Sequence, residues 1–147
     1  MFVGFQGEGH LRIDRDGVVN INNQTFGLGE EGGSGFVDLD GGSLNLYGRP
    51  SSLSLYNGTA SIDFWGGAMT LPDTPENQAY LTRALGDKIL TAYKGDGTVV
   101  VDTQPATGRI VIRGVHSLQP QPTDEALVTA GRVELKWVLP DPCQPGV

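Results

Sequence analysis

Six short segments of this chain share one pattern, in which a polar residue stands between two apolar residues. They cover residues 11–14, 19–22, 37–40, 44–47, 53–56 and 62–65. Such alternation predicts strands with one face in a core and the other face in solvent. The last three segments begin nine residues apart, and all six recur at roughly seven to nine. Because strands this short cannot bury their apolar faces alone, the recurrence predicts stacked strands that share one core.

Glycines separate these segments, and the chain holds 22 of them, which indicates many tight turns. A strand of about four to five residues with a turn of about three to four suits a β-helix, a β-prism or a compact barrel. An antiparallel meander of hairpins is the alternative, since hairpin turns are equally short. The sequence therefore predicts a mainly β fold and leaves these architectures open.

The composition changes near residues 71–75, where glycine-rich strands give way to a segment with lysines. This change predicts a repeated β module over 1–71 and an α+β module over 72–147. Thr74 as N-cap and Pro75 in the first turn predict one helix over 75–85. Strands at 89–93 and 98–102 flank a turn-forming Lys-Gly-Asp-Gly segment, which predicts a hairpin within a small antiparallel sheet. A further strand is expected over 109–113.

The remaining residues predict a long loop, a strand and an extended tail. Two prolines interrupt 116–131, whereas apolar residues alternate over 132–139 and would place Trp137 in the core of the second module. The proline-rich tail over 140–147 is expected to lie outside the core. Cys143 is the only cysteine, which excludes an intramolecular disulfide and indicates synthesis in a reducing cytoplasm.

The charge of the chain argues against two classes of partner. The net charge is −7, and residues 1–71 contain no lysine. An acidic surface repels nucleic-acid phosphates and anionic membranes, so we expect neither as a partner. The first residues lack a secretory pattern, and no apolar run approaches the roughly 20 residues of a membrane span.

Residue motifs for catalysis or metal binding are weak. Residues 14–17 and 38–41 both read Asp-x-Asp-Gly, which occurs in calcium loops, but neither has the glutamate that an EF-hand requires. Aspartate and glycine also form ordinary turns. His10 and His116 lie far apart, and no nucleophile elbow, P-loop or zinc motif is present. The sequence therefore predicts no enzyme, no cofactor and no metal site.

Three aromatic residues end the last three repeated segments: Tyr47, Tyr56 and Trp65. Strand parity points them outward, and their spacing of nine would stack them as a column if the strands are in register. An exposed aromatic column is typical of a protein interface. Two alternatives stay open: the rings fold over the end of the core, or they bind a glycan with Asn45 or Asp63 supplying hydrogen bonds.

The segments over 37–65 and the tail over 140–147 together resemble structural proteins of phage virions. Capsid decoration (cement) proteins, spikes and small tail components combine glycine-rich short strands with extended tails in this way. The resemblance is architectural and carries no site residue. It implies a homo-oligomer, commonly a trimer, that binds a repeated capsid or tail protein lattice. A virion component made in the host cytoplasm is therefore the expected function and location, with a carbohydrate-binding or receptor-binding module as the alternative.

Overall fold

The computed structural model describes residues 1–48, 52–55 and 57–116, and residues 1–117 form one compact unit. Tyr56, the predicted strand over 132–139 with Trp137, the tail over 140–147 and Cys143 lie outside the described residues. The elements in chain order are β1 (Phe2–Val3), β2 (Glu8–Asp14), β3 (Val18–Ile21), β4 (Phe26–Leu28), η1 (Glu30–Gly32), β5 (Ser34–Asp40), β6 (Ser43–Leu46), β7 (Leu53–Leu55), β8 (Thr59–Phe64), β9 (Ala68–Pro72), α1 (Pro75–Gly86), β10 (Leu90–Ala92), η2 (Tyr93–Gly95), β11 (Gly97–Gln104) and β12 (Arg109–His116).

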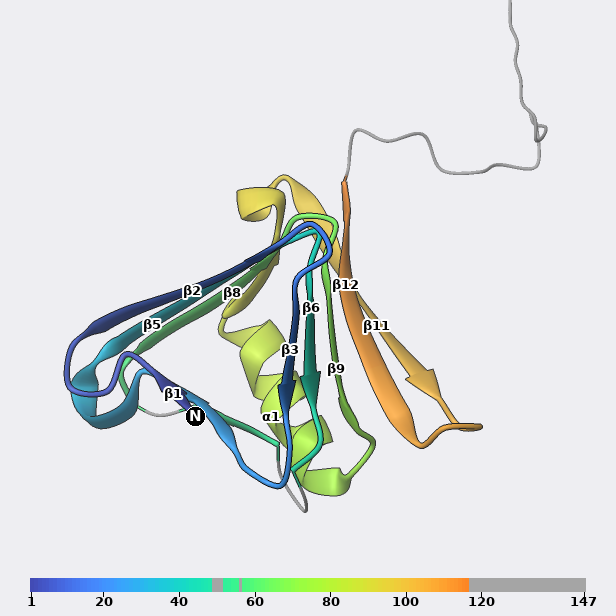
Figure 1. The fold of residues 1–147 in the computed structure, drawn as a ribbon, viewed down its shortest axis with the longest axis horizontal. Coiled ribbons are helices and arrows are strands. Elements are labelled where there is room, and N and C mark those ends of the chain that lie inside the picture. Colours follow the sequence, from blue (N-terminus) through green and yellow to red (C-terminus); the bar gives the residue numbers. More distant parts are fainter. Residues whose placement is uncertain (49–51, 56, 117–147) are drawn as a thin grey trace, which may run out of the picture. The chain divides into compact units, whose positions relative to one another are not determined.

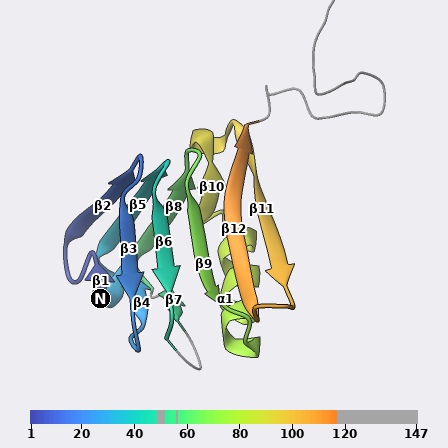
Figure 2. The same cartoon turned by 45° about the vertical axis from the view of Figure 1, so that its right-hand side comes forward.

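The chain passes through three sheets in turn, which confirms a mainly β fold (Figure 1). Sheet 1 has the order β1-β4-β7, sheet 2 the order β10-β8-β5-β2, and sheet 3 the order β11-β12-β9-β6-β3. Three consecutive strands, one from each sheet, make one coil, and the coils are β1–β3, β4–β6 and β7–β9. Strands of successive coils pair in parallel (Figure 2). Residues that face each other across these pairs are 25 to 27 apart in the sequence; Asn20 and Asn45, for example, are 25 apart, and Glu8 and Ser34 are 26 apart.

Apolar residues stack in register inside the three sheets and form one core. Leu44 pairs with Met69, and Leu39 pairs with Phe64; all four are fully buried. The burial pattern of β5 alternates along the whole strand, as the sequence predicts. Burial of apolar surface stabilises a fold by roughly 25 cal/mol for each Å² removed from water, so this shared core is the main stabilising contribution. The six polar residues at the segment centres lie on the outer faces, although Asp63 is only 5% exposed.

The elements that follow the third coil do not form another coil of the same kind. α1 follows β9 and lies beside β7, where the side chain of Arg83 donates to the carbonyl of Leu55 at 3.3 Å. The predicted helix over 75–85 is confirmed as Pro75–Gly86, with the Thr74 hydroxyl accepting from the Asn77 amide. After it, β10 continues sheet 2 in parallel with β8, and the antiparallel pair β11 and β12 continues sheet 3.

The predicted hairpin between 89–93 and 98–102 is wrong. β10 pairs with β8 instead, and β11 forms its antiparallel pair with β12 across residues 105–108. The cause is η2, in which Tyr93 and Lys94 adopt positive φ angles of 52° and 53°. This turn carries the chain around a corner to the next sheet, so the two strands belong to different sheets.

The predicted boundary at 71/72 falls within β9. This strand pairs with β6 of the preceding coil on one edge and with β12 on the other. The composition change therefore marks the place where parallel coils give way to a helix and an antiparallel pair, inside the compact unit over 1–117.

Candidate functional site

The structure places the predicted aromatic residues on different sheets. Tyr47 follows β6 of sheet 3 and is 43% exposed, and Trp65 follows β8 of sheet 2 and is 42% exposed. Tyr56 lies outside the described residues. The predicted single column is wrong, because a step of nine residues moves the chain to the next sheet rather than to the next coil. The two rings are accessible, and their place in an interface stays a prediction.

Tyr47 lies beside a ladder of polar side chains on the outer face of sheet 3. The guanidinium carbon of Arg109 lies 4.5 Å from the centre of the Tyr47 ring. Arg109 also donates to the Thr70 hydroxyl, which donates to Asn45 Oδ1 at 2.9 Å. Asn45 in turn donates to Asn20 Oδ1 at 3.0 Å. The polar groups of Asn45 therefore bind neighbouring strands, which argues against its predicted role as a glycan ligand.

Trp65 belongs to a cluster of rings at the corner between sheets 2 and 3. Its ring centre lies 5.4 Å from that of Tyr93, and Tyr93 lies 4.6 Å from His116 in an edge-on arrangement. Tilted and edge-on pairs at such distances are attractive. We call Trp65, Tyr93 and His116 the aromatic corner. Sequence analysis missed two of its members because they lie 28 and 51 residues from Trp65.

The buried carboxylate of Asp63 holds the turn that carries Tyr93. It accepts hydrogen bonds from the Thr91 hydroxyl at 2.6 Å and from the Lys94 amide at 3.0 Å. A buried carboxylate with two donors is satisfied. Because positive φ at a non-glycine residue is costly, these bonds help to keep Tyr93 and Lys94 in place. Asp63 is therefore a structural residue, and its predicted role as a glycan ligand is not supported.

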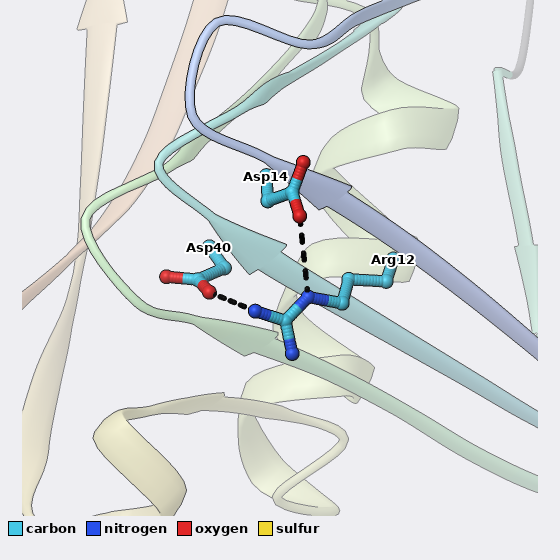
Figure 3. Close-up of polar contacts among 3 residues, drawn as sticks. All are labelled: Arg12, Asp14 and Asp40. Carbon is cyan, nitrogen blue, oxygen red and sulfur yellow. Dashed lines mark hydrogen bonds and ion pairs between the residues drawn. The ribbon is translucent and has the colours of Figure 1, made fainter.

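Acidic side chains surround one arginine on the outer face of sheet 2 (Figure 3). Nε of Arg12 lies 3.7 Å from Asp14, and a terminal nitrogen of Arg12 contacts Asp40 on the neighbouring strand. Asp38 faces Arg12 in the strand register. These ion pairs are largely exposed, so each contributes little to stability.

The described residues offer no group of three or more histidine, cysteine or acidic side chains that could hold a metal ion. The two histidines contact aromatic rings instead: His10 stacks on Phe36 with ring centres 4.9 Å apart, and His116 packs against Tyr93.

Among the strands that the structure describes, those of the first coil form an open end of the sheets. β1, β2 and β3 are each the outermost strand of their sheet (Figure 2). Four large apolar residues are exposed there, namely Met1 at 42%, Phe2 at 47%, Phe5 at 51% and Val18 at 58%. Exposed strand edges and apolar residues together are typical of a surface that binds another chain.

Comparisons with protein-family models, curated proteins and solved structures found no match for this chain. Within the described residues, no helix has the length and apolar character needed to cross a membrane.

Proposed function

We propose that this protein is a structural assembly protein built on a short three-faced parallel β-helix. In this proposal it associates with itself and decorates or stabilises the capsid or tail lattice of a phage virion. The observation that carries the proposal is the difference between the two ends of the coils. One end carries α1 and the β11–β12 pair, and the other ends in three strand edges with exposed Phe2, Phe5 and Val18.

Open strand edges favour association because their backbone N–H and C=O groups can pair with another chain. Proteins that function alone usually cover such edges with a helix, a loop or charged residues. The aromatic corner adds a second accessible surface, at which Trp65 could contact a lattice protein. Both features support an assembly role.

Sedimentation of the full chain tests self-association. We expect a species larger than a monomer at micromolar concentration, and Phe2→Ser with Phe5→Ser should shift it toward the monomer. Val101→Ser is the matched control, because Val101 is exposed at 39% on β11. Co-sedimentation with assembled phage capsids or tails tests the second part. A strictly monomeric protein that binds no assembled lattice would contradict the proposal.

A second candidate is a carbohydrate-binding module that uses the aromatic corner. Trp65 is exposed, and aromatic rings with an accessible face provide apolar contact area beside polar groups. Glycan-array binding that is lost in Trp65→Ala and kept in Tyr47→Ala would support this function. The absence of binding to any glycan would exclude it for the glycans tested.

A further inference from the structure

The free edge of β2 is the longest at the open end. β2 has seven residues, against four in β3 and two in β1. Among the described strands, β2 pairs only with β5, so its other edge has no strand partner. An unpaired edge of this length presents a row of backbone donors and acceptors that can form a ladder with a second strand.

The opposite end of the coils does not offer a matching surface. Sheet 1 meets α1, with the Ser52 amide donating to Asn77 at 2.8 Å, and sheet 3 ends in β11, which runs antiparallel to its neighbour. Head-to-tail stacking of copies would require three strand edges at this opposite end, each able to pair in parallel with β1, β2 or β3 of the next copy. Among the described residues, the surface that offers three matching strand edges to the first coil is therefore the first coil of another copy, and two identical surfaces meet with two-fold symmetry.

Building on the proposed self-association, we infer that two copies pair through their first coils, with β2 of one copy antiparallel to β2 of the other and His10 on the two-fold axis. Antiparallel pairing follows from the symmetry, because the rotation reverses the strand direction. The same rotation brings β1 of one copy to β3 of the other. Phe2, Phe5 and Val18 then lie beside the new ladder and become covered.

The charges along β2 select this register. Its outer face carries Glu8, His10, Arg12 and Asp14 in turn. An axis through Leu11 would place Glu8 opposite Asp14 of the second copy, and like charges directly opposite are destabilising. An axis through His10 places Glu8 opposite Arg12 twice and still pairs residues 8–12. This shift exchanges two repulsive contacts for two attractive ones.

The net charge of the chain does not prevent this contact. Residues 1–25 carry three acidic residues and two arginines, whereas the whole chain has a net charge of −7. The open end thus holds only a small part of the negative charge. Its ring pair, Phe2 and Phe5 with centres 6.2 Å apart, supplies apolar area at the same place.

A cysteine placed at the axis tests this register directly. Opposing residues of an antiparallel pair have Cα atoms about 4.5–5.5 Å apart, within the range that a disulfide accepts. In a Cys143→Ser background, we expect His10→Cys to form a covalent dimer under mild oxidation. Asp14→Cys is the matched control on the same outer face, because Asp14 takes no part in the proposed contacts between the copies. It should stay uncrosslinked, because eight residues separate it from its copy along the strand direction, which is about 26 Å.

The outcomes separate this inference from the broader proposal. A wild-type dimer by sedimentation, with crosslinking at His10→Cys and not at Asp14→Cys, supports the two-fold pairing. A wild-type dimer or larger oligomer without this crosslink overturns the pairing and leaves self-association standing. A wild-type monomer at all concentrations overturns both. As a second check, Glu8→Arg should weaken the dimer, and Glu8→Arg with Arg12→Glu should restore it.

Discussion

Gly67 lies directly against the backbone of Gly42, one coil earlier in the chain. A Cβ atom on Gly67 would be 2.5 Å from the Gly42 carbonyl oxygen, which also accepts a hydrogen bond from the Ala68 amide at 3.1 Å. Real side chains do not approach a backbone oxygen so closely, so only glycine fits here without movement of the coil. The corner between sheets 2 and 3 depends on this close approach.

Gly67→Ala should therefore lower the free energy of unfolding by about 1–3 kcal/mol, the usual cost of overpacking. Urea denaturation measures this change. Gly86→Ala is the control, because a Cβ on Gly86 meets no atom within 4 Å. Alanine also favours the helix, so the control should be neutral or more stable by up to about 1 kcal/mol. Equal effects of the two substitutions would contradict the packing argument.

Asn77 connects α1 to sheet 1 through a buried polar network. It accepts from the Ser52 amide at 2.8 Å and donates to the Pro72 carbonyl at 2.8 Å, and it is fully buried. Asn77→Ala would remove the acceptor of the Ser52 amide, at a cost of about 1–3 kcal/mol. The Pro72 carbonyl would lose one of its donors and keep the Thr74 amide at 3.1 Å. Thermal unfolding should show a clearly lower midpoint. Gln78→Ala, at an exposed neighbour, should change stability by less than about 0.5 kcal/mol.

Asp63→Ala should loosen the turn that carries the aromatic corner. The Thr91 hydroxyl and the Lys94 amide would lose their acceptor, and Tyr93 would no longer be held against Trp65. We expect a lower melting temperature together with a change in Trp65 fluorescence, measured in a Trp137→Phe background. Asp38→Ala is the control on the neighbouring strand, where the carboxyl is half-buried and faces Asp63 in register. An unchanged Trp65 spectrum in Asp63→Ala would contradict the positioning role.

The polar ladder on sheet 3 should make a smaller contribution. Asn45→Ala removes bonds to Asn20 and Thr70 on a partly exposed face, so we expect a loss of about 1 kcal/mol. Ser43→Ala in the same strand is the control, because Ser43 also points outward from β6. Chemical denaturation of both variants measures the difference, and an Asn45→Ala loss no larger than that of Ser43→Ala would show that the ladder adds no stability.

Local patterns were sufficient to predict most strands and the helix. Alternation around Asp38 and Asn45 identifies β5 and β6, since strand geometry itself places successive side chains on opposite faces. Thr74 and Pro75 identify the start of α1 for an equally local reason. The outward direction of Tyr47 and Trp65 follows from the same parity and agrees with their exposure.

The candidate site was only partly predictable. Trp65 and Tyr47 were named from the sequence, whereas Tyr93, His116 and the supporting role of Asp63 were not. The missing information was the coil length: glycines recur at 17, 42 and 67, a spacing of 25. The shorter spacing of seven to nine residues separates successive strands of one coil, which belong to different sheets. It therefore does not show which residues lie side by side in one sheet.

The sequence by itself determined which residues form strands, which of their faces is apolar, and where the helix begins, because these properties depend on neighbours a few positions away. Only the tertiary structure decided that β10 joins sheet 2, that β11 pairs with β12, and that Trp65 meets Tyr93. These contacts depend on how the chain turns at each corner, where close backbone approach and positive φ angles select one path. Within the part of the chain that the structure describes, the same arrangement leaves the outer edges of β1, β2 and β3 without a strand partner.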